Sequence, residues 1–432
     1  MSCITIAIST IFQNGGDATR ALEIGKIIRD YKPEEYSLKI VFISRGSQYE
    51  KRVIESGFDL YLAKPQMEGI RYQDDFKTGF GELIGDEYLA REILQGEIAA
   101  YKEIKPDILI HGFWPIASIA KQLQIPETKS IAFLPLPLKR GFLKEEHGFP
   151  DEIFLSKLPE AIQKLIFKII PLRIKEKNPA IRHSHIKKAA LELGWKGNMV
   201  NIFDMIKADL FLVNDLPHFY KIDNYTNCIF TGPIYARNET NGIDDPEILK
   251  ILAISNSMKK IFCTLGSSGR KKDLLEVIEM FNTPEGQQYS AIILSPPSVC
   301  PINESMKKSK NPNVFITDKF VSAKEINKRV DLVICHGGQG TLQTAITCGT
   351  PLIGVASQPE QKVNLVHLDS YGSAIRIPFW NWNKRTIGKK VDFIFKKYTV
   401  FKERAESLSN IYNQMKPMEI IGKSIWDEIR ND

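Results

Sequence analysis

The sequence has few cysteines and lacks the patterns in which cysteines usually serve a function. Six cysteines occur among 432 residues, no two form a C-x-x-C pair, and several lie inside apolar runs. A disulfide framework and a zinc site are therefore not indicated, and a reducing cytoplasm suits the chain.

Long apolar runs are absent as well. No run approaches the ~18 residues that a membrane-spanning helix needs. Met1 to Thr5 leads directly into a strand-like segment, without the basic region or cleavage site of a signal peptide. We therefore expect a cytoplasmic protein. With 43% hydrophobic and 25% charged residues, the composition is that of a soluble globular chain long enough for two domains.

The most informative stretch runs from Val330 to Ala345. Val330 to Cys335 is apolar and rich in β-branched residues, which predicts a buried parallel strand. His336 to Gly340 interrupts it with three glycines, and Thr341 to Cys348 then predicts a helix. The first N–H groups of such a helix have no partners within the helix and point outward at the positive end of its dipole. The pattern predicts a cradle for a diphosphate.

Two common phosphate motifs do not fit this stretch. A dinucleotide fingerprint, G-x-G-x-x-G, would match at Gly338 and Gly340, but its third glycine position is Gln343. The G-K-[ST] ending of a Walker A loop is also missing. A dinucleotide oxidoreductase is therefore disfavoured.

The residues beyond this helix narrow the interpretation. Gly349-Thr350-Pro351 precedes a second apolar strand, after which Glu360 and Gln361 stand shortly before Asn364. The combination H-G-G-x-G-T, G-T-P and E-Q-x-x-N resembles the donor-binding half of inverting nucleotide-sugar glycosyltransferases, the UDP-glycosyltransferase-like family with the two-Rossmann GT-B fold. The resemblance is most specific over Lys259 to Ile377.

The resemblance implies a donor-binding role for the matching positions. They are Ser267, Val321, His336, Gly338, Gln339, Gly340, Thr341, Glu360 and Gln361. His336 would face the phosphates, the backbone amides of the glycine turn would bind them, and Glu360 with Gln361 would hold sugar hydroxyls. The alternatives are a buried structural histidine and a solvated loop. Many members that use a uridine nucleotide have glutamate where this chain has Thr344, so the base and ribose stay open.

The amino-terminal half predicts alternating strands and helices. Ile4 to Ser9 predicts a strand, Ala18 to Tyr31 a helix and Leu38 to Ser44 the next strand, which is a βαβ unit of a doubly wound sheet. The intervening loop resembles a turn of bacterial and sterol-type family members in which an aspartate, here Asp17, is the proposed catalytic base. Helix capping is an equal alternative for Asp17. The expected fold class is α/β, of the GT-B type, with two Rossmann-like doubly wound domains facing each other across a cleft.

Three further residues are candidates for acceptor binding. His111, Trp114 and His147 each follow a predicted strand end, where ligands of doubly wound sheets bind. A structural role in the core is nevertheless favoured for all three.

The predicted domain boundaries follow from these segments. Residues 1–237 form the acceptor-binding domain, 238–258 a polar linker, 259–405 the donor-binding domain and 406–432 a C-terminal helix. A return of that helix to the amino-terminal domain is one arrangement.

Residues 156–188 concentrate positive charge. They contain nine basic and two acidic residues, an excess of seven that equals the formal net charge of +7 for the whole chain. Interleaved apolar residues predict a basic amphipathic helix around Pro171. Peripheral contact with the inner membrane face, burial of the apolar stripe against a sheet, and solvated charge are the three interpretations. No nucleic-acid module accompanies the charge, so nucleic acid is not an expected partner.

The predicted activity is transfer of a hexose-type sugar from a nucleoside-diphosphate sugar, with UDP as first choice. The acceptor would be a hydroxyl of a small molecule or a lipid, and attack would invert the anomeric carbon. The chain has no D-x-D pair, with which metal-dependent single-Rossmann transferases hold a divalent ion. We therefore expect neither metal nor cofactor, the sugar nucleotide being a co-substrate. A GT-B nucleotide-sugar epimerase and a non-catalytic sugar-nucleotide-binding subunit are the alternatives.

Overall fold

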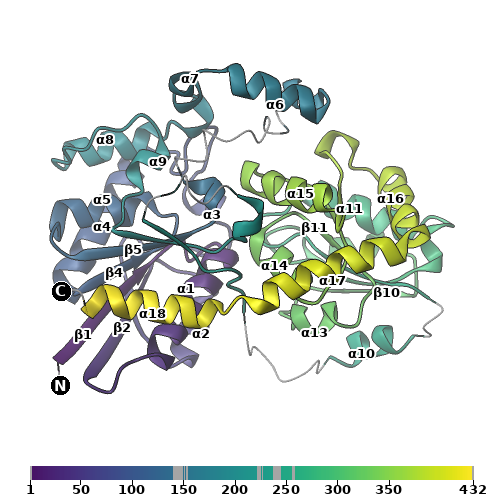
Figure 1. Cartoon of the computed structure of the whole chain (residues 1–432), viewed down its shortest axis with the longest axis horizontal. Coiled ribbons are helices and arrows are strands. Elements are labelled where there is room, and N and C mark those ends of the chain that lie inside the picture. Colours follow the sequence, from purple (N-terminus) through teal and green to yellow (C-terminus); the bar gives the residue numbers. More distant parts are fainter. Residues whose placement is uncertain are drawn as a thin grey trace. The chain divides into compact units, whose positions relative to one another are not determined.

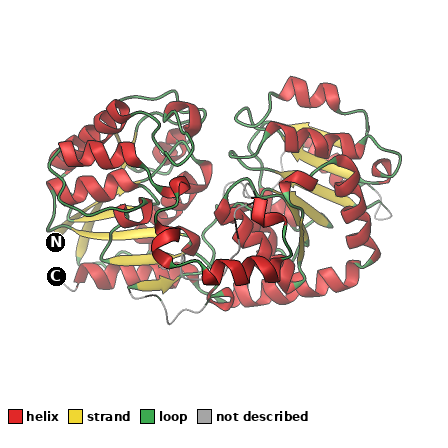
Figure 2. Ribbon diagram, turned by 90° about the horizontal axis from the view of Figure 1, so that it is seen from above, coloured by secondary structure: helices red, strands yellow, loops and turns green. Residues whose placement is uncertain are grey.

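The computed structural model of the chain forms two compact units (Figure 1). It describes residues 2–139, 149, 151, 154–220, 225, 227–236, 245–254 and 258–430. Unit 1 consists of Met1–His147, Lys164–Ile234 and Lys416–Asp432, and unit 2 of Gly148–Gln163 and Tyr235–Met415. In each unit, a sheet is covered by helices on both faces (Figure 2). The expected α/β class with two parallel-sheet domains is confirmed.

Unit 1 contains seven parallel strands in the order β3-β2-β1-β4-β5-β6-β7. Its strands are β1 (Ser2–Ser9), β2 (Tyr36–Ser44), β3 (Asp59–Leu62), β4 (Ile108–His111), β5 (Lys129–Leu134), β6 (Leu210–Val213) and β7 (Cys228–Phe230). Its helices are α1 (Gly15–Asp30), α2 (Glu50–Glu55), α3 (Tyr72–Asp75), α4 (Glu87–Ile104), α5 (Pro115–Gln124), α7 (Leu172–Glu176), α8 (Ser184–Glu192), α9 (Ile202–Met205) and α18 (Pro417–Arg430).

The core of unit 1 has two layers, one on each face of the sheet. Because successive side chains of a strand point to opposite faces, Ile6 and Ile8 of β1 pack with residues of α1 and α18, whereas Ala7 packs with residues of α4, α5 and α8. This two-sided burial accounts for the nearly continuous apolar runs of these strands.

Unit 2 contains six parallel strands in the order β10-β9-β8-β11-β12-β13. Its strands are β8 (Lys260–Thr264), β9 (Ser290–Leu294), β10 (Val314–Thr317), β11 (Leu332–Cys335), β12 (Leu352–Gly354) and β13 (Ala374–Arg376). Its helices are α10 (Pro246–Ala253), α11 (Lys271–Phe281), α12 (Ile302–Lys308), α13 (Ala323–Asn327), α14 (Gln339–Thr347), α15 (Pro359–Tyr371), α16 (Lys384–Lys396) and α17 (Tyr398–Gln414). The loops after β8, β11 and β12 share one edge of the sheet, because parallel strands end at the same side.

The domain boundaries differ from the sequence prediction at three places. Part of the predicted polar linker 238–258 forms α10 (Pro246–Ala253), which belongs to unit 2. Unit 2 takes up 148–163, a segment that lies far upstream of the rest of it, and the division falls inside α6 (Glu160–Ile169). The predicted end of the donor domain at residue 405 falls inside the continuous helix α17. The single predicted C-terminal helix is therefore wrong: α17 ends at Gln414 and α18 begins at Pro417, whose missing N–H suits a helix start.

Helix α18 belongs to unit 1, where it packs on α1. The indole nitrogen of Trp426 donates to the carbonyl of Ile28 at 3.1 Å, and its ring stacks on Tyr36 with ring centroids 5.6 Å apart. Gly422 lies against Tyr31, where a β-carbon would meet the tyrosine ring at 2.5 Å.

Within the basic segment, α6 and α7 are short helices separated at Pro171, and α8 begins at Ser184. Gln163 is the one buried residue of α6, and α7 has none. Apolar side chains point to solvent instead: Leu165 is 58% and Ile169 72% exposed. Burial of the apolar stripe against the sheet is therefore wrong for these helices. In the part of the chain that the structure describes, no helix is both long and apolar enough to cross a bilayer.

Candidate functional site

The predicted strand, glycine turn and helix form at the carboxyl edge of the unit 2 sheet. β11 is buried throughout, and the turn reverses at Gly337, whose φ of +82° favours glycine. Gly338 is the N-cap of α14 and has no side chain with which to cap it. The amino end of α14 therefore presents backbone N–H groups at the positive end of the helix dipole.

The glycines around this turn serve two purposes. A β-carbon at Gly266 or Gly338 would lie 2.5 Å or 2.3 Å from an atom of the His336 ring, so both residues make room for the imidazole. A β-carbon at Gly340 would meet nothing within 4 Å. Open space for an approaching phosphate thus lies at Gly340, whereas the other two glycines hold the histidine ring.

His336 is 6% exposed and packs between these loops. Burial lowers the pKa of His336 from its ordinary value to about 4, because the charged ring would be desolvated. The ring is therefore neutral at neutral pH. Its Nδ1 is buried and makes no hydrogen bond within the described part of the chain, whereas a hydrogen bond between the ring and the backbone of Thr264 partly opposes the effect of burial on the pKa. An unsatisfied polar atom in the interior is unusual, and a bound ligand is one kind of partner that could satisfy it.

The first turns of α15 connect the loops of this edge. The side-chain amide of Gln361 accepts from the N–H of Ser357 at 2.9 Å and donates to Oγ of Ser268 at 3.3 Å. Gln361 is 2% exposed. Its amide therefore joins the loop after β12 to the loop after β8, which is a positioning role within the protein.

Glu360 and Asn364 form a second connection. The amide nitrogen of Asn364 lies 2.7 Å from Oε1 of Glu360 and 3.2 Å from the carbonyl of Gly337. Glu360 is half-buried in the first turn of α15. The turn after β11 and the start of α15 are thus held together through Asn364, with the Glu360 carboxylate beside them.

The other predicted donor residues lie around the same edge. Ser267 stands in the loop after β8, and Val321 lies between β10 and α13; both are half-buried. Gln339 is buried and Thr341 half-buried in the first turn of α14. The hydroxyl of Thr344 donates to the carbonyl of Gly340 at 2.7 Å, so it is used within the helix.

Two serines of this site were not identified from the sequence. Ser268 contacts Gln361, and the hydroxyl of Ser357 is buried without a partner in the described part of the chain. The small-residue turn Gly266 to Gly269 was a signal for Ser268. Nothing in the sequence marks Ser357, whose position depends on the fold of α15.

Asp17 lies in unit 1, at the amino end of α1. The N-cap of this helix is Asn14, whose side chain accepts from the N–H of Gly16, so the capping interpretation of Asp17 is wrong. Asp17 is 8% exposed and its Oδ1 lies 2.5 Å from a guanidinium nitrogen of Arg20. The pair holds the carboxylate at the carboxyl edge of the unit 1 sheet, and catalysis by Asp17 stays a prediction.

His111 and Trp114 are buried in unit 1. The ring nitrogens of His111 lie 2.9 Å and 3.3 Å from the carbonyls of Gly112 and Lys207, and burial lowers the pKa of His111. Trp114 stacks on Phe76 with ring centroids 5.5 Å apart. These contacts fit the favoured structural interpretation. His147 lies outside the described residues, and acceptor binding by the three stays a prediction.

The described residues contain no group of three or more His, Cys, Asp or Glu side chains placed to hold a metal ion. The groups that a ligand at the amino end of α14 would meet are backbone N–H groups and the neutral His336 ring.

Comparisons with known proteins support the resemblance seen in the sequence. Residues 261–417 match the family model described as the glycosyltransferase family 28 C-terminal domain. A "PGL/p-HBAD biosynthesis glycosyltransferase" of Mycobacterium tuberculosis is 31% identical over 117 residues, which are 27% of this chain and 24% of the relative. A "PGL/p-HBAD biosynthesis rhamnosyltransferase" of Mycobacterium bovis is 22% identical over 308 residues, which are 68% of this chain and 62% of the relative. The matches thus span less than two thirds of either relative.

The fold has relatives among solved structures. The crystal structure of the glycotransferase of kitacinnamycin aligns with a TM-score of 0.66 at 17% identity, covering 100% of this chain and 99% of the other. The chain therefore has the GT-B fold of these glycosyltransferases, and its residues 261–417 are similar to the C-terminal domain of glycosyltransferase family 28.

Proposed function

We propose that the chain transfers a sugar from a nucleoside-diphosphate sugar to an acceptor hydroxyl, with inversion at the anomeric carbon. The observation that carries this proposal is the amino end of α14. It combines an uncapped helix start, open space at Gly340 and the buried, unsatisfied Nδ1 of the neutral His336, all within the segment that matches the family model. Such an arrangement suits a diphosphate.

The same residues provide a chemical role. As the bond between the anomeric carbon and the diphosphate oxygen breaks, negative charge grows on the departing nucleoside diphosphate. The helix N–H groups and a ring N–H of His336 stabilise that charge more strongly in the transition state than in the ground state. This stabilisation does not call for a metal ion.

The acceptor needs a base. The acceptor oxygen forms a bond to the anomeric carbon from the face opposite the leaving group, and its proton passes to the Asp17 carboxylate. General base catalysis of this kind contributes roughly 10²–10⁴-fold. The ion pair with Arg20 keeps the Asp17 carboxylate in one orientation.

The donor is proposed only as a nucleoside-diphosphate sugar, without a particular base or sugar. UDP is the first choice from the resemblance, but the Thr344 hydroxyl is used within α14 and gives no argument for a particular ribose. One relative is named a rhamnosyltransferase and another a glycosyltransferase. Rhamnosyl and hexosyl donors on several nucleotides are therefore the candidates.

The acceptor is proposed to be amphiphilic or lipid-borne. The exposed apolar side chains of α6 and α7 alternate with basic residues, a pattern that favours an anionic membrane surface. Each basic side chain near such a surface contributes about 1 kcal/mol, so four or five give reversible, salt-sensitive binding. The chain would then act as a peripheral protein on the cytoplasmic face.

A substrate screen tests the proposal. Hexosyl and rhamnosyl derivatives of UDP, dTDP and GDP are incubated with the protein and a panel of hydroxyl acceptors, with and without a chelator. We expect one donor to shift the melting temperature and to yield a glycoside of inverted configuration, equally well in chelator. Sugar isomerised on its nucleotide would support an epimerase instead, and binding without turnover would support a non-catalytic subunit.

A further inference from the structure

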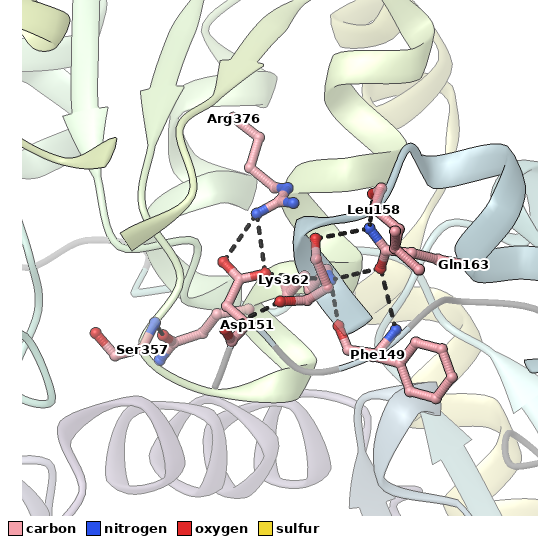
Figure 3. A network of polar contacts seen from close by, with 9 residues as sticks. Phe149, Asp151, Leu158, Gln163, Ser357, Lys362 and Arg376 are labelled. Carbon is pink, nitrogen blue, oxygen red and sulfur yellow. Dashed lines mark hydrogen bonds and ion pairs between the residues drawn. The ribbon is translucent and has the colours of Figure 1, made fainter. Parts of the chain in front are cut away.

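A buried cluster of charges lies just beyond the proposed donor residues and consists of Lys362 of α15, Arg376 of β13 and Asp151. Oδ1 of Asp151 lies 3.1 Å from Nζ of Lys362, and Oδ2 lies 2.9 Å from a guanidinium nitrogen of Arg376. Figure 3 shows Asp151 lying between these two cations. The side chains of Asp151 and Lys362 are 3% and 5% exposed, and that of Arg376 is 12% exposed.

The Asp151 carboxylate is the shared partner of two buried cations, so its loss would leave both of them unpaired. Burial lowers the pKa of Lys362, and the Asp151 carboxylate opposes that effect. A buried charge that loses its partner destabilises a protein strongly, whereas replacement of a whole cluster by apolar residues often does not. A further cost arises because a cation near the amino end of a helix opposes the helix dipole. Helix stability therefore does not explain Lys362.

Lys362 also forms hydrogen bonds with the segment 148–163, to which Asp151 belongs. Its Nζ donates to the carbonyl of Phe149 and lies 3.4 Å from Oε1 of Gln163. Gln163 in turn accepts from the N–H of Phe149 at 3.3 Å and donates to the carbonyl of Leu158 at 2.7 Å (Figure 3). It also donates to the carbonyl of Ser156 at 2.8 Å. The described residues between 149 and 163 are thus gathered around one ammonium group that comes from α15.

The cluster holds the parts of unit 2 on which the donor site is built. Lys362 directly follows Gln361, which connects Ser357 with Ser268. Arg376 ends β13, whose neighbour β12 leads into the loop of Ser357. Asp151 therefore fixes the start of α15 and the end of β13 relative to one another. It does so from a segment more than 200 residues away in sequence.

We propose that Asp151 is a positioning residue for the donor site, acting through Lys362 on Gln361 and on the loops that Gln361 joins. The inference rests on the proposed function, because it assumes that these loops bind the donor. Small displacements of binding groups are costly: a shift of ~1 Å can reduce activity about 100-fold. Loss of the contact between Asp151 and Lys362 should therefore weaken donor binding beyond its effect on stability.

Two variants separate positioning from stability. Asp151→Asn leaves two cations facing a neutral amide and should lower both stability and nucleotide affinity. Lys362→Met removes the contact with α15 but leaves Asp151 and Arg376 as a neutral pair, so its stability should change less. The matched control is Asp331→Asn. Asp331 directly precedes β11, at the opposite edge of the same sheet, and its carboxylate lies 3.0 Å from Nζ of Lys259.

The measurement is the dissociation constant for UDP, dTDP and GDP by titration calorimetry, together with the melting temperature. For the nucleotide that wild type binds, we expect the constant to rise about tenfold or more in Asp151→Asn and in Lys362→Met, and to stay unchanged in Asp331→Asn. Amide hydrogen exchange of residues 357–364 should also become faster in the first two variants, a readout that serves even where Asp151→Asn is too unstable to titrate.

The outcomes distinguish the two proposals. A wild type that binds none of the nucleotides would overturn the proposed function and this inference with it. Wild-type affinity and wild-type exchange at 357–364 in folded Lys362→Met would overturn the positioning role alone. An affinity loss that tracks the melting temperature across all three variants, the Asp331→Asn control included, would mean that the cluster is merely structural.

Discussion

At the scale of single residues, Asp17 is the proposed general base. We expect Asp17→Asn to reduce turnover roughly 10²–10⁴-fold, because the amide cannot accept a proton at neutral pH. The affinity for the donor should stay near that of wild type, since the proposed donor residues belong to unit 2. Steady-state kinetics with a saturating donor would show the loss in kcat.

Arg20→Met is the matched control for that variant. Both substitutions break the same ion pair, whose side chains are 10% and 11% exposed, so both should lower the free energy of unfolding by about 3 kcal/mol. Only Asp17→Asn also removes the proton acceptor. Turnover near that of wild type in folded Asp17→Asn would assign the base to another group, of which His111 is the next candidate.

The lowered pKa of His336 predicts how the free energy of unfolding depends on pH. Its pKa falls from 6.5 to about 4 in the folded chain. Above pH 6.5 both folded and unfolded states carry a neutral ring. Between pH 6.5 and about 4 the unfolded state binds a proton that the folded state does not bind. The free energy of unfolding should therefore fall as pH falls through this window, by about 1.4 kcal/mol per pH unit from this residue.

His336→Asn should remove that slope from unit 2, because asparagine does not titrate. Hydrogen exchange of β11 and α14 between pH 7 and pH 5 would measure it. His183→Asn is the control, since burial lowers the pKa of His183 to about 4 as well, but in unit 1. An unchanged slope in β11 and α14 of His336→Asn would show that the histidine is not buried as described.

At the scale of elements, α6 and α7 carry the proposed membrane contact. Neutralising Lys164, Lys168, Arg173 and Lys175 to glutamine should abolish cosedimentation with anionic liposomes at low salt, because charge attracts the segment to the surface. A second variant, Leu165→Ser with Ile169→Ser, should also weaken it by removing exposed apolar area.

The control for this experiment removes the same charge elsewhere. Lys389, Lys390, Lys396 and Lys397 stand at the exposed surface of α16 and just after it in unit 2. Their replacement by glutamine should leave liposome binding intact. If both sets of substitutions reduced liposome binding equally, the binding would be a general effect of charge. If wild type did not bind liposomes at all, a soluble small molecule would be the better candidate for the acceptor.

The same helices show what the sequence could not predict. Their amphipathic pattern is identical whether the apolar side meets a sheet or solvent, so exposure of Leu165 and Ile169 had to be seen in the fold. The β11, turn and α14 order was predictable, in contrast, because its signals are local: a β-branched apolar run, glycines, and a helix that ends before Pro351.

The residues of the site likewise divide into those predictable from local motifs and those that depend on the fold. Local motifs predicted His336 and the helix start near Gly338. They did not predict why glycine is needed at Gly266 and Gly338. Both make space for the His336 ring, and Gly266 does so from the loop of another strand. The Asn14 cap was missed because Asn14 and Asp17 are both good caps three positions apart.

At the scale of the whole molecule, the two doubly wound units were predictable and their chain composition was not. Alternating strands and helices in both halves fix the parallel sheets. Nothing in the composition of 148–163 indicates that it packs on unit 2. Its contacts with unit 2 include the ion pairs of Asp151 with Lys362 and Arg376, which are far downstream in the sequence. Such pairings are set by tertiary structure alone.

The central claim is that the amino end of α14 binds the donor diphosphate, and Gly340→Val tests it most directly. The substitution meets no protein atom within 4 Å of the added β-carbon and should fold, but it fills the space for a phosphate. Gly388→Val is the matched control in α16, where the nearest atom to a β-carbon is Cγ of Met280 at 3.6 Å. Titration of UDP, dTDP and GDP into the three proteins should show binding by wild type and Gly388→Val and none by folded Gly340→Val. Equal affinity in wild type and folded Gly340→Val would contradict the account.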